Sequence, residues 1–395
     1  MKILWVKSDF LHPTERGGQI RTLEMLRRLH QRHEVHYVAL ANSRYPEGPA
    51  RATEYCSFAY PLAHDLPPQG TAAFLWQLIA SVISPLPLSI SRYRSAAMRR
   101  QLTDLLTKHT FDAVVCDFVF PAQNLPHLDQ SFLFQHNVET LIWRRHAANP
   151  RNLFKRIYFR MQAARMFRHE RAVCRAVKQI VTVSEADAQL TRELFDLSTQ
   201  IAVVPTGVDC DYFAPPPAVE PFCDLIFIGA MDWMPNIDGV LYFVREIWPK
   251  VQAAYPNSTL GIVGRSPFPE IRRLAEDPRI KVTGTVPDIR PYLWGSSVSI
   301  VPLRIGGGTR LKIYESMAAG VPVVSTGVGA EGLPVEHPTH IRLADTPDLF
   351  AAQCGQLLSD QAERSGMAAR ALEWVASSYS WETVVRCFEK ILAGA

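Results

Sequence analysis

The sequence has little of what marks a secreted or membrane-spanning protein. Its seven cysteines are scattered, with no Cys-x-x-Cys pair and no zinc-like spacing, which argues against a disulfide framework and indicates a reducing, cytoplasmic setting. The opening stretch "MKILWVKSDF" lacks the length and cleavage site of a signal peptide. Pro85 and Pro87 interrupt the most apolar window, residues 73–90, so we expect no transmembrane helix.

Composition and charge indicate a globular chain with two unlike halves. The apolar fraction is 47% and the charged fraction 20%, and a length of 395 residues favours two or three domains over one. Residues 1–200 hold 26 Lys and Arg against 17 Asp and Glu, whereas residues 201–395 hold 16 against 21. The two halves therefore differ in the sign of their charge, which predicts different partners for each.

Short runs rich in Val and Ile alternate with segments of helical spacing along most of the chain. Such runs occur at residues 2–6, 34–40, 112–116 and 179–183, and again at 224–231, 260–264, 280–284, 298–302 and 321–325. Strands that alternate with helices predict parallel sheets covered by helices on both faces. The pattern breaks at the proline-rich segment 203–222 and then restarts, so we expect an α/β protein with two doubly wound, Rossmann-like domains in tandem.

The stretch "RIGGGTRLKIYESMAAGVPVVS" at 304–325 carries the strongest signal for a ligand. Three glycines follow a predicted strand and precede a predicted helix, whose first turn holds Arg310 and Lys312. Backbone amides and cations at a helix N-terminus favour a bound anion, so we expect a phosphate site there. The loop lacks the Gly-Lys-Ser/Thr ending of a P-loop, and it is not a Gly-x-Gly-x-x-Gly after the first strand of a domain, which disfavours a dehydrogenase.

These residues carry a family resemblance. The stretches "VTVSEADA" (181–188), "VVPTGVDCDYF" (203–213), "FIGAMDWMPNIDGV" (227–240), "VTGTVPDIRPYL" (282–293) and "IGGGTRLKIYESMAAGVPVVSTGVGAEGL" (305–333) resemble group-1, family-4 type GT-B retaining glycosyltransferases. The resemblance implies an acceptor-binding domain at 1–205, a nucleotide-sugar domain at 206–375 and a C-terminal helix at 376–395 that returns to the first domain. The donor would be a UDP or GDP sugar, with no further cofactor and no metal.

The resemblance also implies roles for particular residues. Glu315 would accept hydrogen bonds from both ribose hydroxyls, while Gly307 stands where relatives commonly place an acid on the donor sugar. We expect donor contacts and catalytic groups in two sets. The donor contacts are Gly17, Gly18, Gly229, Val286, Gly306, Gly307, Gly308, Thr309, Glu315, Gly329, Ala330 and Glu331, and the catalytic groups are His136, Arg310 and Lys312.

Further candidates lie in the first half and in the linker. Relatives keep a glycine pair and a histidine at the places of Gly17, Gly18 and His136; Arg21 is a possible added phosphate contact and Glu139 a weaker candidate. The "DCD" of residues 209–211 imitates an Asp-x-Asp metal site, but it lies in the linker, so we expect no metal there.

The segment 144–178 is unusually basic. Residues 139–178 hold eleven Lys and Arg and two acids, interleaved with aromatic side chains. This composition is typical of a peripheral contact with an anionic membrane surface, while a solvated helix face is the simpler interpretation. No nucleic-acid-reading motif accompanies it, so we expect no nucleic-acid partner.

Together these features predict a metal-independent retaining glycosyltransferase of hexosyltransferase type. It would move a sugar from a nucleoside diphosphate sugar to a glycan, lipid-linked or other hydroxyl acceptor in cell-envelope or exopolysaccharide synthesis. Its setting would be cytoplasmic, with peripheral contact at the inner face of the cell membrane. Two alternatives stay open: a GT-B nucleotide-sugar epimerase, and a non-catalytic nucleotide-sugar binding or scaffold protein.

Overall fold

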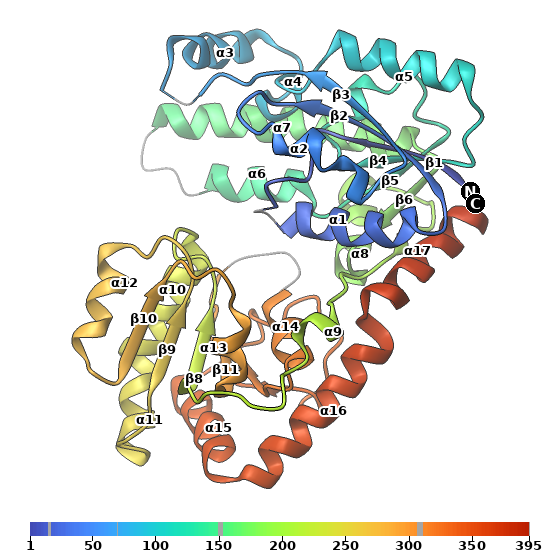
Figure 1. Cartoon of the computed structure of the whole chain (residues 1–395). Coiled ribbons are helices and arrows are strands. Elements are labelled where there is room, and N and C mark those ends of the chain that lie inside the picture. Colours follow the sequence, from blue (N-terminus) through green and yellow to red (C-terminus); the bar gives the residue numbers. More distant parts are fainter. Residues whose placement is uncertain (15–16, 69, 149–152, 306–310, 395) are drawn as a thin grey trace. The chain divides into compact units, whose positions relative to one another are not determined.

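The structure is a computed structural model that describes residues 1–14, 17–68, 70–148, 153–305 and 311–394 (Figure 1). The chain divides into two compact units. Unit 1 consists of Met1–Pro205 and Val385–Ala395, and unit 2 consists of Thr206–Val384. Each unit contains one fully parallel sheet, and each is described separately below.

The sheet of unit 1 has the strand order β3-β2-β1-β4-β5-β6-β7. Its strands are β1 (Lys2–Lys7), β2 (Glu34–Ala41), β3 (Phe58–Ala63), β4 (Ala113–Asp117), β5 (Ser131–Phe134), β6 (Gln179–Thr182) and β7 (Ala202–Val203). The central strands are apolar on both faces because helices cover both. The sequence pattern did not indicate β3, which contains Pro61 and lies at the edge, where a missing N–H is tolerated.

Alternate side chains of β1 face two different layers of helices in unit 1. Leu4 and Val6 lie in one apolar cluster with Met98 of α5 and Met166 of α7. Trp5 points to the other face, where its ring centroid lies 5.8 Å from that of Phe388 on α17. The helices of unit 1 are α1 (Gly17–His30), α2 (Glu47–Ala50), α3 (Ala72–Ile83), α4 (Leu88–Ser91), α5 (Ala96–Lys108), α6 (Glu139–Ala148), α7 (Leu153–Ala176) and α8 (Glu185–Phe195).

The sheet of unit 2 repeats this arrangement with the order β10-β9-β8-β11-β12-β13. Its strands are β8 (Cys223–Ile228), β9 (Leu260–Val263), β10 (Ile280–Gly284), β11 (Ser296–Val301), β12 (Val323–Ser325) and β13 (Arg342–Leu343). Its helices are α9 (Cys210–Phe213), α10 (Met234–Tyr242), α11 (Trp248–Ala254), α12 (Pro269–Arg273), α13 (Arg290–Trp294), α14 (Leu311–Ala318), α15 (Pro347–Ser359) and α16 (Gln361–Tyr379). The last helix, α17 (Trp381–Gly394), begins in unit 2 and ends in unit 1.

One helix of unit 2 differs from the sequence pattern. The apolar spacing from Ile237 to Val251 predicts a single helix, but a five-residue π-helical turn at Phe243–Ile247 separates α10 from α11. Pro249 has no N–H to donate to the preceding turn, and the wider turn accommodates this loss. The apolar face continues across the π-helical turn, since Val240, Phe243 and Ile247 are all buried.

The described helices include none that combines the length and the apolar character needed to cross a bilayer.

Candidate active site

The site of unit 2 lies where the strand order of its sheet reverses. β8 and β11 are neighbours, but the chain continues from β8 to β9 on one side and from β11 to β12 on the other. Parallel sheets of this kind bind ligands beyond the carboxyl ends of the strands at this switch point. Gly229 follows β8 directly, and α14 follows the loop after β11. Both segments therefore border one edge of the sheet.

Lys312 of α14 lies at this switch point. Its Nζ donates to Oδ1 of Asn236 on α10 at 2.9 Å and lies 4.3 Å from the centre of the Phe227 ring. The amide of Asn236 is fixed in turn, because its Nδ2 donates to the carbonyl of Ala230 at 2.9 Å. Lys312 is thus a positioned cation that retains part of its accessible surface.

The lack of a side chain at Gly229 leaves room for Lys312 and Asn236. A Cβ at residue 229 would lie 2.9 Å from Nζ of Lys312 and 2.6 Å from Nδ2 of Asn236. Gly264, after β9, is equally constrained, because a Cβ there would lie 1.7 Å from the carbonyl oxygen of Gly229. The backbone therefore approaches Lys312 and the neighbouring strand more closely than any side chain would allow.

Glu315 lies three residues after Lys312, on the next turn of α14. Its side chain is partly buried, and none of the described residues donates a hydrogen bond to its carboxylate. Burial raises the pKa of Glu315 to about 7, while the nearby charge of Lys312 acts in the opposite direction. The result is a partly buried carboxylate with two acceptor oxygens and a pKa close to neutrality.

Two further loops end at the same edge of the sheet. After β10, Val286 packs against the core of unit 2. After β12, the turn at 326–332 contains Gly329, Ala330 and Glu331. The amides of these three residues donate inside the turn, to Thr326 Oγ1, Thr326 O and Val328 O respectively. The role of these residues in sugar binding stays a prediction.

Several predicted site residues lie outside the described residues. They are Gly306, Gly307, Gly308, Thr309 and Arg310. Their roles stay predictions from the sequence.

In unit 1, a buried charged cluster occupies the corresponding switch point between β1 and β4. Asp117, the last residue of β4, is fully buried and accepts four hydrogen bonds. Its Oδ2 accepts from Trp5 Nε1 at 2.9 Å, from Lys7 Nζ at 2.9 Å and from Thr22 Oγ1 at 2.7 Å. Its Oδ1 lies 2.8 Å from Nε2 of His136. Burial alone would raise the pKa of Asp117, but Lys7 and His136 hold it well below its ordinary value.

The contact with Asp117 decides which nitrogen of His136 carries the proton. An ionised carboxylate only accepts, so Nε2 of His136 donates to it. Burial lowers the pKa of His136 to about 4, and the opposing effect of Asp117 does not restore it. The ring is therefore neutral at physiological pH, and its Nδ1 is left as a hydrogen-bond acceptor.

Phe118 and Gly18 enclose this histidine. The Phe118 ring stacks on His136 with centroids 4.1 Å apart and an interplanar angle of 11°. Phe118 has a φ of 68°, a conformation that is costly for a bulky side chain and is found mainly at functional sites. A Cβ on Gly18 would lie 3.0 Å from the Phe118 ring and 3.8 Å from His136 Nδ1. Gly17 and Gly18 begin α1, so the helix N-terminus lies next to the histidine.

Arg21 and Glu139 have structural partners. The guanidinium of Arg21 is buried, donates to the carbonyls of Val204 and Pro205, and lies 4.5 Å from the centre of the Phe134 ring. Both hydrogen bonds come from Nη2, and Nε and Nη1 are buried without a hydrogen-bond partner among the described residues. The suggested charge contact of Arg21 stays a prediction.

Glu139 is the first residue of α6, and its N–H donates to Glu170 at 3.0 Å. Glu170 also accepts from the N–H and the hydroxyl of Thr140. Burial and the charge of Glu170 raise the pKa of Glu139 to about 8. The Glu170 carboxylate therefore caps the first turn of α6.

A separate cavity of about 160 Å³ lies in unit 1 beyond the ends of β1 and β2. Both polar and aromatic side chains line it, including Asp9, His12, Asn42 and Tyr93. Such a mixture suits a ligand that carries hydroxyl groups.

Sequence reasoning missed Lys7, Asp117, Phe118 and Asn236. Asp117 directly follows a predicted buried strand, and this position is the sequence feature that could have indicated a site residue. The carboxylate of Asp209 caps α9, where it accepts from the N–H of Tyr212. Among the described residues, no group of three or more His, Cys, Asp or Glu side chains is arranged to hold a metal ion.

Comparison with known protein families gives two matches. The family model described as "Glycosyltransferase Family 4" matches residues 16–212, and the one described as "Glycosyl transferases group 1" matches residues 223–360. The two matches divide the chain close to the boundary between unit 1 and unit 2.

Three relatives illustrate the sequence similarity. An uncharacterized 44.6 kDa protein in the cps region of Klebsiella pneumoniae is 21% identical over 373 residues, 89% of each chain. The GDP-mannose-dependent alpha-(1-6)-phosphatidylinositol monomannoside mannosyltransferase of Mycobacterium tuberculosis is 26% identical over 51% of this chain and 57% of its own length. The O-antigen chain mannosyltransferase B of Escherichia coli is 29% identical over 40% of this chain and 42% of its own length. The chain thus matches only about half of each mannosyltransferase.

Solved structures share the fold over the whole chain. HepE of Anabaena in complex with UDP has a TM-score of 0.68 at 14% identity, with 100% of both chains covered. TarM has a TM-score of 0.68 at 11% identity over 99% of each chain. WaaG, a glycosyltransferase involved in lipopolysaccharide biosynthesis, has a TM-score of 0.65 at 12% identity over 100% of each chain. The predicted GT-B architecture of two Rossmann-like domains is therefore confirmed.

Proposed function

Because the chain belongs to the group-1, family-4 type glycosyltransferases, we propose that it transfers a hexose from a nucleoside diphosphate sugar to a hydroxyl group of a glycan or lipid-linked acceptor. The observation that carries this proposal is the arrangement at the switch point of unit 2. There Lys312, held by Asn236, lies beside Gly229 and one helical turn before Glu315. A cation beside an approachable backbone suits a diphosphate, and a carboxylate suits a ribose.

In the proposed reaction the donor diphosphate lies against Lys312, with Arg310 and the glycine loop as further predicted contacts. The bond between the anomeric carbon and the phosphate oxygen breaks, and negative charge grows on the departing diphosphate. A fixed cation stabilises this charge more in the transition state than in the ground state. The acceptor oxygen then bonds to the anomeric carbon, and its proton passes to the leaving diphosphate. We propose retention of the anomeric configuration and no requirement for a metal ion.

The neutral His136 has a positioning role in this proposal. Its Nδ1 accepts a hydrogen bond from a hydroxyl of the donor sugar, because Nε2 is committed to Asp117. An acceptor of fixed orientation holds the anomeric carbon in line without adding positive charge next to a developing oxocarbenium ion. In this proposal Gly17 and Gly18, at the start of α1, are further contacts for the donor phosphates.

The acceptor enters, in this proposal, through the cavity lined by Asp9, His12, Asn42 and Tyr93. Its mixed polar and aromatic lining suits a sugar ring, which presents hydroxyl groups on its edges and an apolar face. The mannosyltransferase names among the relatives and the UDP complexes among the structural neighbours support testing GDP-mannose and UDP-hexoses as donors. The same names support an acceptor in cell-envelope glycan synthesis.

The test is incubation of the full chain with GDP-mannose, UDP-glucose, UDP-galactose and UDP-N-acetylglucosamine, each with and without a lipid extract as acceptor. We expect release of nucleoside diphosphate with one donor, stimulated by the extract and unaffected by EDTA. Conversion of one nucleotide sugar to another without release would show an epimerase instead. Donor binding with no turnover under any condition would show a non-catalytic binding protein. Loss of turnover on chelation would contradict the metal-independent reaction.

A further inference from the structure

Helix α3 of unit 1 presents an apolar face to solvent. Five large apolar side chains on it are exposed, and the largest exposures are 70% for Trp76 and 88% for Ile83. The other three are Leu75, Ile79 and Val82. The helix contains no Asp, Glu, Lys or Arg, so no charge breaks this face. A contiguous exposed apolar patch of this kind marks a binding surface.

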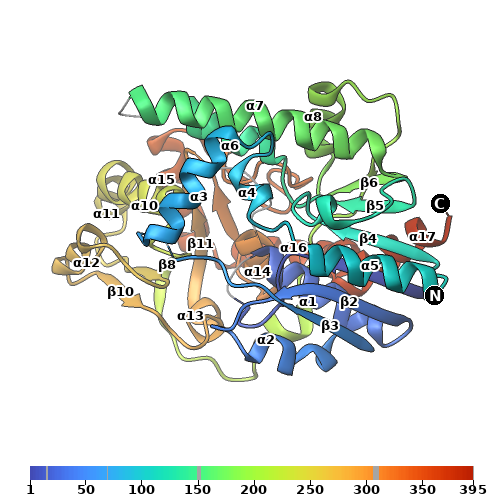
Figure 2. The same cartoon turned by 90° about the horizontal axis from the view of Figure 1, so that it is seen from above.

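Contacts with α7 fix the orientation of α3. The Arg165 guanidinium donates to the carbonyls of Ser81 and Val82, which belong to the last turn of α3. The Ser81 hydroxyl lies 3.0 Å from the hydroxyl of Tyr158 on α7. Figures 1 and 2 both show α3 beside the N-terminal half of α7. The polar side of α3 is therefore turned to α7, and its apolar side is directed away from the protein.

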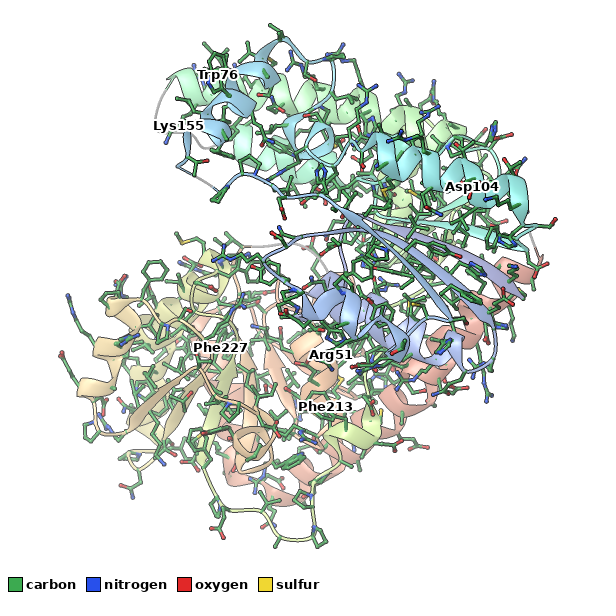
Figure 3. The ribbon with its side chains drawn as sticks, turned by 45° about the horizontal axis from the view of Figure 1, so that its top comes forward. Arg51, Trp76, Asp104, Lys155, Phe213 and Phe227 are labelled. Carbon is green, nitrogen blue, oxygen red and sulfur yellow. The ribbon has the colours of Figure 1, made fainter. Side chains whose placement is uncertain are left out.

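The adjoining surface of α7 is cationic. Lys155, Arg156, Arg160 and Arg168 are exposed, and among the described residues no acidic side chain pairs with them. Glu170 is the only acidic residue within Leu153–Ala176, and it is buried against the start of α6. Figure 3 labels Lys155 and Trp76 at the same end of this helix pair. Positive charge and exposed apolar surface therefore lie side by side.

A separate open groove lies between α6 and α7. It has a volume of about 550 Å³ and is lined by Arg144, Arg160 and Arg168 together with Ala163, Ala164 and Phe167. The Arg144 guanidinium lies 5.3 Å from the centre of the Phe167 ring. Cations around an apolar floor suit an amphiphile with an anionic head and an apolar tail.

From these features we propose that α3 and the α6–α7 groove form the surface on which this protein docks to a bilayer containing anionic lipids. The α3 side chains enter the interface between headgroups and acyl chains, and the arginines of the groove contact lipid phosphates. A symmetric dimer through this face would oppose the same patch on two copies, placing cations against cations. The charge thus favours a lipid surface over a second copy of the chain.

The proposal concerns membrane contact and not catalysis, so the test measures binding of the protein to lipid vesicles. The full chain is sedimented with vesicles of phosphatidylcholine alone and with vesicles that also contain phosphatidylglycerol. We expect binding to the anionic vesicles that weakens with added salt, and little binding to phosphatidylcholine. Removing a cation is expected to weaken binding about five-fold for each of Arg156→Gln and Arg160→Gln. Arg99→Gln with Arg100→Gln, exposed on α5 of the same unit, is the matched charge control.

A second set of variants tests the apolar face of α3. Trp76→Ser with Ile83→Ser is expected to weaken vesicle binding at least ten-fold, while Leu349→Ser, an exposed apolar position on α15, leaves it unchanged. Trp76→Phe keeps binding but loses part of the quenching of tryptophan fluorescence by brominated lipids. Equal vesicle binding of wild type and the double variant Trp76→Ser with Ile83→Ser would overturn the proposal. So would a concentration-dependent dimer in light scattering that Trp76→Ser converts to a monomer.

Donor binding separates this proposal from the proposed function. The α3 variants are expected to bind nucleotide sugars as the wild-type protein does, because α3 lies outside the switch-point residues. Failure of donor turnover in every protein, with vesicle binding intact, would overturn the proposed function alone. Failure of vesicle binding with donor turnover intact would overturn the docking surface alone.

Discussion

Oδ1 of Asp117 lies 2.8 Å from Nε2 of His136, and this contact fixes the tautomer of a buried, neutral imidazole. The carboxylate is itself held by Lys7, Trp5 and Thr22. The histidine thus presents Nδ1 as an acceptor beside the N-terminus of α1. The two residues come from the ends of neighbouring strands, β4 and β5.

The role of His136 is testable with His136→Gln. We expect kcat to fall about 100-fold, because the donor sugar loses its orienting acceptor. The affinity for free nucleoside diphosphate should stay unchanged, since His136 touches only the sugar in this proposal. Steady-state kinetics and calorimetric titration with the diphosphate separate the two effects. Equal losses of diphosphate affinity and turnover would show that His136 acts on the phosphates or on folding.

The Lys7–Asp117 pair is expected to contribute to stability. Lys7→Met leaves the Asp117 carboxylate buried without its cation and should lower the free energy of unfolding by about 3 kcal/mol. The measurement is a urea unfolding curve followed by circular dichroism. The control is Lys108→Met, which removes the exposed pair with Asp104 and should have little effect. Similar midpoints for the two variants would contradict the importance assigned to the buried pair.

Glu315 should make donor binding depend on pH. Because its pKa is raised to about 7, a pH of 6 leaves only about a tenth of the carboxylate ionised, and the affinity for a nucleotide sugar should be about ten-fold lower there than at pH 8. A nucleotide sugar is the appropriate probe, since its diphosphate is a diester that does not titrate in this range. Glu315→Gln should bind weakly at both pH values. A wild-type affinity that does not change with pH would contradict the ribose assignment.

The raised pKa of Glu315 also affects the stability of the free protein, which should fall as pH rises. A raised carboxyl pKa means that the folded state holds the proton more strongly than the unfolded chain, so this contribution is lost as pH rises through about 7. Glu315→Gln should therefore raise the thermal midpoint relative to wild type more at pH 8 than at pH 5. The exposed Glu270→Gln, on α12, is the control. A Glu315→Gln effect that is independent of pH would show that Glu315 does not titrate as inferred.

Gly229→Ala tests the close approach of the backbone to Lys312. The added Cβ would displace Lys312 Nζ and the Asn236 amide, so donor affinity should fall at least ten-fold. Gly366→Ala is the matched control, because its Cβ would meet only the end of the Arg370 side chain in α16. The control should be neutral or slightly stabilising. Unchanged donor binding in Gly229→Ala would remove Lys312 from the proposed phosphate site.

The sequence was sufficient to predict the alternation of strands and helices, the tandem domains and the family. The cluster around Asp117 could not be predicted, because Lys7 and Asp117 are far apart in the chain and become neighbours only when β1 pairs with β4. The π-helical turn at Phe243–Ile247 left the apolar spacing intact and therefore could not be predicted from that spacing. The exposure of the apolar side chains in residues 73–90 could not be predicted either, since an apolar run does not show whether the rest of the protein covers it.

The division of the chain has a consequence for experiments on its parts. Unit 1 contains both chain termini, and unit 2 is inserted between Pro205 and Val385. A fragment that stops at Pro205 would leave Trp5 without the Phe388 ring of α17, whereas residues 206–384 form one continuous segment. The second unit is therefore the better choice for separate expression and donor-binding measurements. The first would need its C-terminal helix rejoined, for example by circular permutation through the nearby N-terminal strand.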